Sequence, residues 1–264
     1  MLKNIILYHV LNLIIIKGEY DMIEDLLKSH VINYNLLTED RYFYNNNPVP
    51  RVTELLSEIH EEYLMLWANS LGFRRRRYKD ELEMAAYIGT NVHEFIEQFL
   101  IKKEFNELTR VDTEYFVKIN NAVNSFIMWY SDVSKNNNIE ILGMEQKLVC
   151  PWFGGTYDVL LKINGKIYLG DFKTSNHVGY KYFLQLAAYK YMLEYYYNTK
   201  IDGCLILQLD KNCVAYEEYL LDFSNIEHLN FINQCTTTFL SLVYTYYNKL
   251  QTIDMYKNIF KKRG

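Results

Sequence analysis

Three strand-like segments near the middle of the chain constrain its fold most. They span residues 139–149, 155–163 and 166–172, and only Asn164 and Gly165 separate the last two. An Asn-Gly pair between two apolar runs is a strong signal for a two-residue β-hairpin, because that turn needs a positive φ at both positions. The sequence therefore predicts an antiparallel hairpin that brings the region of Asp158 next to Asp171.

Helical patterns surround these strands. Upstream, the spacing of apolar residues predicts two short helices in 2–30 broken at Gly18, followed by a hairpin of 31–36 with 41–44 that ends in a turn at 45–50. Four helices are predicted next, from about 52 to 59, around 63–72, over 79–103 and over 112–133. The third of these has a break or kink at Gly89. Downstream, the same spacing predicts a helix at 180–197, strands at 203–209 and 214–221, and a closing helix at 225–262. This order predicts an α/β fold with a mixed central β-sheet flanked by helices and a helical N-terminal half.

The composition favours a single domain. The 264 residues include only 11 Gly and 3 Pro, so no linker-like seam divides the chain. We expect one domain over 1–264, made of a helical and hairpin N-terminal part (1–84), a core (85–222) and a C-terminal helix (223–264). The apolar stretch 5–16 is shorter than the roughly 20 residues that a membrane span needs. A cytoplasmic protein without a membrane partner is therefore expected, in the host cytoplasm if the chain is viral.

Charge limits how this chain can meet a nucleic acid. The formal net charge is −4, so there is no global attraction to a polyanion and any positive charge must act locally. Arg74, Arg75, Arg76 and Arg77 with Lys79 put five positive charges into six residues. They form either a phosphate clamp near a site entrance or an ordinary solvated face, and the sequence leaves both interpretations open.

Four short patterns carry chemistry, and each alone has an ordinary structural explanation. They are His93 with Glu97, Gly155 with Asp158, Asp171 with Lys173, and Gln185 with Tyr189. Each helical pair is spaced by four residues and shares one helix face, whereas Asp171 and Lys173 share one face of a strand. Two carboxylates held together on one sheet repel unless a cation lies between them. Hard oxygen ligands favour Mg²⁺ or Mn²⁺, and His93 could add a nitrogen.

In this order the patterns resemble those of the PD-(D/E)XK nuclease superfamily, in its RecB-like branch. Upstream, Pro50-Arg51-Val52-Thr53-Glu54-Leu55-Leu56, followed by Trp67 and Gly72, is similar to the lead-in of the mitochondrial genome maintenance exonuclease family and its phage relatives. Arg51 stands where that family usually has Ser. The abundance of Tyr, Asn, Ile and Lys is typical of an A/T-rich coding sequence, such as that of a phage or virus.

The resemblance implies a role for each matching residue. His93, Asp158, Asp171 and the carbonyl of Phe172 would bind one or two Mg²⁺ or Mn²⁺ ions. Lys173 would position the attacking water and stabilise charge on the phosphate. Gln185 and Tyr189 would brace the site or touch the DNA backbone, with Glu97 and Glu145 as second candidates for orienting His93 or a metal-bound water. Some relatives carry a four-cysteine iron–sulfur cluster with one Cys before the His motif, but here no Cys precedes Cys150, so no cluster is expected.

The implied function is a Mg²⁺- or Mn²⁺-dependent deoxyribonuclease. We expect an exonuclease that acts on single-stranded DNA or on DNA ends in replication, recombination or repair, with replication or recombination proteins as further partners. Two alternatives remain open at this point. One is an endonuclease built on the same core, and the other is a non-catalytic DNA-binding subunit. The presence of Asp158, Asp171 and Lys173 together argues against the second alternative.

Overall fold

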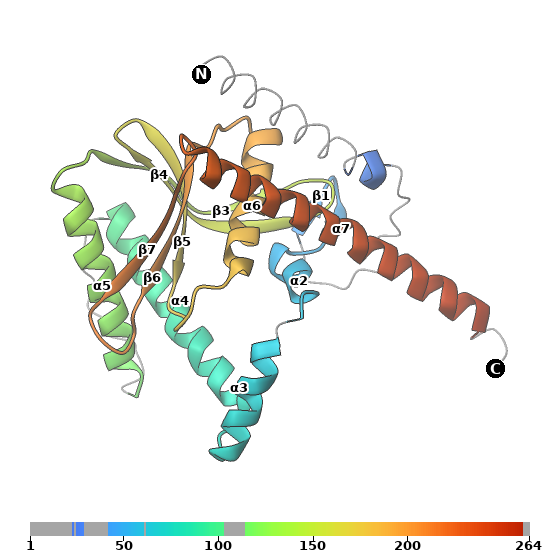
Figure 1. Ribbon diagram of the computed structural model, residues 1–264, viewed down its shortest axis with the longest axis horizontal. Coiled ribbons are helices and arrows are strands. Elements are labelled where there is room, and N and C mark those ends of the chain that lie inside the picture. Colours follow the sequence, from blue (N-terminus) through green and yellow to red (C-terminus); the bar gives the residue numbers. More distant parts are fainter. Residues whose placement is uncertain (1–22, 24, 29–41, 61, 103–113, 261–264) are drawn as a thin grey trace.

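A five-stranded mixed β-sheet forms the centre of the protein, with helices on both faces (Figure 1). The computed structural model describes residues 23, 25–28, 42–60, 62–102 and 114–260. The strands are β3 (Ile139–Val149), β4 (Gly154–Ile163), β5 (Lys166–Lys173), β6 (Gly203–Leu209) and β7 (Tyr216–Asp222), in that spatial order. β5 and β6 run parallel and the other neighbours run antiparallel. The predicted α/β class with a mixed, helix-flanked sheet is confirmed.

The hairpin between β4 and β5 forms as the sequence predicts. Asn164 and Gly165 have φ angles of 50° and 88°, and Ile163 pairs with Lys166 across the turn. The β4–β5 ladder reaches its last pair at Val159 and Gly170. Continuing this register by one position brings Asp158 opposite Asp171, at the point where the two strands stop pairing.

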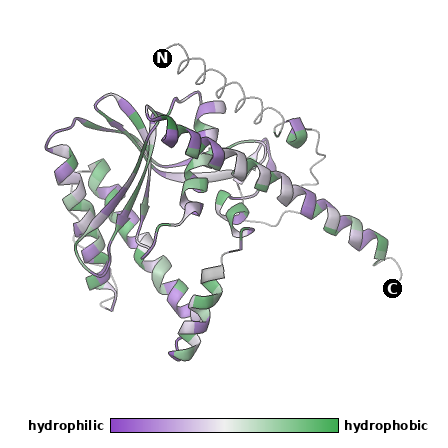
Figure 2. Ribbon diagram, viewed as in Figure 1, coloured by the Kyte–Doolittle hydropathy of each residue, from purple (hydrophilic) through white to green (hydrophobic). Residues whose placement is uncertain are grey.

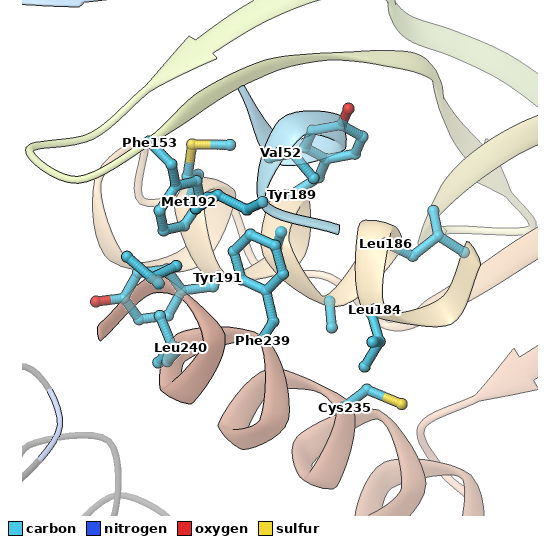
Figure 3. Close-up of a cluster of buried hydrophobic side chains, with 14 of the residues drawn as sticks. Val52, Phe153, Leu184, Leu186, Tyr189, Tyr191, Met192, Cys235, Phe239 and Leu240 are labelled. Atoms are coloured by element: carbon cyan, nitrogen blue, oxygen red, sulfur yellow. The ribbon is translucent and has the colours of Figure 1, made fainter. Parts of the chain in front are cut away.

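Two apolar cores lie on opposite faces of the sheet. α4 (Tyr78–Lys102) and α5 (Phe116–Ser134) cover one face, where the rings of Phe126 and Phe172 lie 5.6 Å apart. α6 (Tyr180–Tyr195), α7 (Ile226–Phe260) and the short α2 (Val52–Ser57) cover the other. There Phe153 contacts Phe239 at 5.0 Å between ring centres, among the side chains of Figure 3. Hydrophobic and hydrophilic segments alternate along α5 and α7 (Figure 2), as packing on one side requires.

The N-terminal hairpin differs from its prediction. β1 (Tyr42–Tyr44) pairs with β2 (Asn47–Val49), so the segment expected to be a turn at 45–50 contains a strand. The turn falls on Asn45 and Asn46, whose φ angles of 49° and 66° suit a tight reversal. The predicted strand at 31–36 lies outside the described residues. So does most of 2–30, of which residues 23 and 25–28 are helical.

Of the break or kink expected at Gly89, the break is wrong, because α4 continues through this residue. One glycine inside a helix costs only about 1 kcal/mol relative to alanine, and the packing of α4 on the sheet outweighs that cost. α3 (Glu62–Phe73) precedes α4, as predicted. Other boundaries differ by a few residues: α2 ends at Ser57, α6 ends at Tyr195 and β7 begins at Tyr216. In the described part of the chain, no helix combines the length and the apolar character that crossing a membrane would take.

Asp222 fixes the end of β7, and its contacts predict an acid dependence of stability. Its carboxylate accepts hydrogen bonds from Lys166 Nζ at 2.7 Å and from the backbone N–H of Ser224 at 2.9 Å, and these lower the pKa of Asp222 to about 2. Because this folded pKa lies below the unfolded value of about 3.9, the stabilisation is complete above the unfolded pKa and is lost as pH falls through the folded one.

We therefore expect Asp222→Asn to lower the free energy of unfolding in urea at pH 6 and to do so by less at pH 3. Denaturation curves of both proteins at the two pH values measure this difference. An equal difference at both pH values would contradict the assignment of the shift to this carboxylate.

Candidate metal centre

Three carboxylates stand in one row across three neighbouring strands. Glu145 is on β3, Asp158 on β4 and Asp171 on β5, and continuing the registers of the two strand pairs by one position places each opposite the next. Asp158 is 8% exposed and Asp171 is 1% exposed. Like charges at directly opposite positions destabilise a sheet, more strongly when they are shielded from water. A positive charge among the three carboxylates would therefore reduce their mutual repulsion.

Glu145 adopts a backbone conformation that L-residues rarely take. Its φ is 47°, and the β3–β4 pairing skips this residue between Met144 and Gln146. A left-handed conformation costs a non-glycine residue roughly 1–2 kcal/mol. The backbone strain directs the Glu145 side chain into the same cluster as Asp158, which is a pattern found at functional sites.

His93 reaches the carboxylates from α4, on the helical layer above the sheet. Its Nδ1 lies 3.5 Å from Oε1 of Glu145 and 3.6 Å from Oδ2 of Asp158. Its Nε2 lies 2.9 Å from the carbonyl oxygen of Phe172, and the backbone N–H of Phe172 donates to Oδ2 of Asp158 at 2.7 Å. Among the described residues, one ligand atom each from His93, Glu145 and Asp158 lies within 4.8 Å of the others.

The electrostatics of His93 show that this cluster attracts positive charge. Burial by itself would lower the pKa of His93. The hydrogen bond that His93 donates to Glu145 and the charge of Asp158 together outweigh burial and raise the pKa of His93 to about 9. The carboxylates thus hold a proton on the imidazole at neutral pH, in the position that a bound cation would take over.

A buried ion pair lies beside this cluster. Asp171 Oδ2 is 2.6 Å from Lys173 Nζ, while Asp171 Oδ1 has no hydrogen-bond partner among the described residues. Burial raises the pKa of Asp171 to about 6, although Lys173 opposes the rise. Burial would lower the pKa of Lys173, but Asp171 and Asp158 outweigh it and raise the pKa, so Lys173 stays charged.

Gln185 and Tyr189 support Lys173 from α6. Nζ of Lys173 donates to Oε1 of Gln185 at 3.5 Å, and Nε2 of Gln185 donates to the hydroxyl of Tyr189 at 3.4 Å. Tyr189 in turn packs on the backbone of Gly155, where an added Cβ would lie 2.5 Å from its ring. The glycine of the Gly-x-x-Asp pattern is therefore required by the tyrosine of the Gln-x-x-x-Tyr pattern.

The structure gathers most of the predicted residues but not all of them. The predicted residues that lie together are His93, Asp158, Asp171, Phe172, Lys173, Gln185 and Tyr189. Glu145, expected only as a second candidate for orienting His93 or a metal-bound water, lies next to His93 in the same cluster. Glu97 is outside the group of ligand atoms found among the described residues.

The four arginines, Arg74 to Arg77, lie elsewhere, on the exposed connection between α3 and α4. Arg77 precedes His93 by 16 positions, or about 24 Å along a straight helix, so the run is not part of the cluster around His93. Arg76 forms an ion pair with Glu81, and Arg77 lies 3.6 Å from Asp80.

The donors present fit a hard divalent cation. They are carboxylate oxygens, a backbone carbonyl oxygen and an imidazole nitrogen, a set that suits Mg²⁺ or Mn²⁺. The unpartnered Oδ1 of buried Asp171 is a second indication, because a buried carboxylate oxygen without a partner is costly. Mg²⁺ itself prefers oxygen, and the imidazole makes Mn²⁺ equally acceptable.

The strain at Glu145 gives a prediction in which stability and metal binding move in opposite directions. Glu145→Gly removes the left-handed penalty and should raise the free energy of unfolding of the metal-free protein by roughly 1 kcal/mol relative to Glu145→Gln, which keeps it. Both variants lose the carboxylate and should bind Mn²⁺ more weakly than wild type. Urea denaturation and calorimetric titration with Mn²⁺ measure the two effects. A glycine variant less stable than the glutamine variant would contradict this account.

Comparisons with known proteins add little to this geometry. No protein-family model matches the chain, and no curated protein matches it. One solved structure, described as the crystal structure of SSO0001, is similar at 14% identity and a TM-score of 0.26, over 59% of this chain and 84% of that one. A similarity this low carries no argument about fold or function, so the functional reasoning below rests on the site.

Proposed function

We propose that this chain is a metal-dependent nuclease of the PD-(D/E)XK type that hydrolyses phosphodiester bonds in DNA. The observation that carries the proposal is the buried Asp171–Lys173 pair beside the cluster of His93, Glu145 and Asp158. Burying two charged carboxylates and a lysine at the end of a sheet costs desolvation energy, and packing does not explain why the protein keeps them there. Phosphodiester hydrolysis explains it, because the reaction needs a cation and a separate positive charge near one phosphate.

The proposed roles are of two kinds: several residues would bind the metal ion, and one lysine would provide positive charge to the phosphate. His93, Asp158, Asp171 and the Phe172 carbonyl would hold the ion, with Glu145 as a further ligand or as the partner that orients His93. A bound divalent ion supplies a water of lowered pKa and neutralises the non-bridging phosphate oxygens. Lys173 is held protonated by its carboxylate neighbours, so it offers a positive charge to the phosphate and does not remove a proton.

The mode of attack that we propose is exonucleolytic, on single-stranded DNA or on DNA ends, in replication, recombination or repair. The support for this part is the family resemblance of the His, Asp, Asp-x-Lys and Gln-x-x-x-Tyr patterns and of the upstream segment from Pro50. Two alternatives are an endonuclease on the same core and a non-catalytic DNA-binding subunit. The experiment below distinguishes both of them from an exonuclease.

Labelled DNA tests the proposal directly. Linear DNA labelled at one end and covalently closed circular DNA labelled internally, each single- and double-stranded, are incubated with the protein in Mn²⁺, in Mg²⁺ and in a chelator. We expect metal-dependent loss of linear DNA, strongest for single strands, and no loss of closed circles. Cutting of circles at the same rate would replace the exonuclease with an endonuclease. No cleavage of any substrate with either metal would refute a nuclease altogether.

A further inference from the structure

A pocket of about 380 Å³ lies beside the two α6 side chains that support Lys173. Gln185 and Tyr189 line this pocket, and Oε1 of Gln185 accepts a hydrogen bond from Nζ of Lys173 at 3.5 Å. The hydroxyl of Tyr189 points out of the apolar cluster that Figure 3 shows. Gln185 therefore contacts both the pocket and the proposed metal centre, so a ligand could extend from one to the other.

Two cationic side chains from different segments line the same pocket. They belong to Arg51, which directly precedes α2, and to Lys147 on β3. Both residues are held against the start of β4 by backbone pairing. Lys147 pairs with Thr156 in the β3–β4 ladder, and Arg51 forms a parallel bridge with Gly154, whose N–H donates to the carbonyl oxygen of Pro50 at 3.0 Å.

This pairing places the two cations on opposite edges of β4. Gly154 pairs with Val149 of β3 on one edge, so its bridge to Arg51 occupies the other edge. β5 does not cover that edge, because its pairing with β4 ends at Val159 and Gly170. Neighbouring strands lie about 4.8 Å apart, so the backbones that carry the two cations are roughly 10–12 Å from each other. Two long side chains can reach one ligand across such a distance.

The chemistry of the pocket wall suits an anion. Thr53 and Thr156 add hydroxyl groups to the two cations, and among the described residues that line the pocket none carries a carboxylate. Glu54, close to Arg51 in the sequence, uses its oxygens elsewhere. Its Oε1 accepts from the hydroxyl of Tyr246 at 2.5 Å, and its Oε2 accepts from the backbone N–H of Arg51 at 3.4 Å. Arginine, lysine and hydroxyl groups together are typical ligands of a phosphate.

We propose that Arg51 and Lys147 bind a backbone phosphate of the DNA strand in this pocket, one nucleotide away from the phosphate at the metal centre. This inference rests on the proposed function and adds a binding position to it. Contacts to phosphate position a strand without reading its bases, so this position would hold the strand for cleavage whatever its sequence. Lys147 is the better residue to test, because its side chain is exposed on a strand, whereas Arg51 is also the N-cap residue of α2.

The first test is binding of a short single-stranded DNA in Ca²⁺ at several salt concentrations, for wild type, Lys147→Gln, Lys147→Arg and Lys162→Gln. Lys162 is the matched control, because it lies on the same sheet, about 20 Å along β4 from Thr156, and 3.5 Å from Glu140. Losing one phosphate contact should reduce the slope of log K against log salt by about 0.7. We expect this reduction, with several-fold weaker binding at low salt, in Lys147→Gln alone. Binding of Mn²⁺ should stay unchanged.

The second test locates the phosphate along the strand. One linkage at a time is replaced by a neutral methylphosphonate, and each strand is titrated with wild type and with Lys147→Gln. Neutralising the phosphate that Lys147 contacts should weaken binding by wild type but should have little further effect on the variant, because the contact is already lost. We expect this coupling at one linkage, next to the linkage that wild type cleaves in Mn²⁺.

The outcomes separate the two proposals. If wild type degrades DNA but Lys147→Gln keeps the wild-type slope and couples to no linkage, the phosphate pocket is refuted and the nuclease stands. Coupling only at a linkage far from the cleaved one would contradict the placement of the pocket beside Lys173. If one linkage couples to Lys147 but DNA is never cleaved, the phosphate pocket stands and the nuclease fails. If wild type neither binds nor cleaves DNA, both are overturned.

Discussion

Asp171→Asn is expected to reduce DNA cleavage on the order of 1,000-fold and to weaken Mn²⁺ binding strongly. The substitution keeps the shape of the side chain and removes its charge, so the ion loses a buried anionic ligand that has an oxygen without a partner. Cleavage of a labelled single strand in Mn²⁺ measures the first effect, and calorimetric titration measures the second.

The same substitution leaves Lys173 without its buried partner. Breaking a buried pair costs about 3–5 kcal/mol, so the free energy of unfolding should fall as well. Circular dichroism must therefore show that the variant is folded at the assay temperature. Asp202→Asn is the matched control, because Asp202 accepts from the N–H of Ile167 at the other end of β5 and should leave cleavage unchanged. A folded Asp171→Asn protein that cuts as fast as wild type would show that the site is wrongly assigned.

Lys173→Met should also slow cleavage, by roughly 100- to 1,000-fold, but without loss of the metal. Lys173 is a cation that repels a bound ion, so removing it should leave Mn²⁺ affinity equal or higher. The two substitutions at one ion pair therefore separate the roles of its members. One variant loses both metal binding and cleavage, and the other loses cleavage alone.

A second nearly buried lysine provides the control for Lys173→Met. Lys190 is 8% exposed and pairs with Glu194 on α6 at 2.7 Å, outside the cluster. Lys190→Met should reproduce the loss of stability that comes from breaking such a pair and should spare cleavage. Loss of Mn²⁺ binding in Lys173→Met would contradict the division of roles, as would equal cleavage defects in the two lysine variants.

Several parts of the structure could be predicted because local chemistry decides them. Asn164 and Gly165 determine the β4–β5 turn, and that turn sets the register which brings Asp158 beside Asp171. The predicted turn at 45–50 was wrong because Asn45 and Asn46 reverse the chain by themselves, and no short-range pattern distinguishes a turn from a strand that begins two residues later. The expected break at Gly89 was wrong because tertiary packing outweighed a weak local preference.

The place of Glu145 in the cluster could not be predicted from the sequence. A tight turn fixes the register of β4 with β5, but a longer connection through 150–153 joins β3 to β4 and leaves their register open. The left-handed backbone at Glu145 interrupts that pairing and has no sequence signature, because nothing but the surrounding sheet holds a glutamate there. The cluster of His93, Glu145 and Asp158 thus needed the folded sheet to become visible.

The order of helices and strands, the β4–β5 hairpin and the two carboxylates that this hairpin joins follow from the amino-acid sequence. Spacing along the chain decides such features, since periodicity and turn geometry act over a few residues. Which groups from distant segments meet depends on the tertiary structure. It brought His93 and Glu145 to Asp158, and it left the four arginines on the connection between α3 and α4. Burial and charge act through space, so their balance exists only once the helices have packed on the sheet.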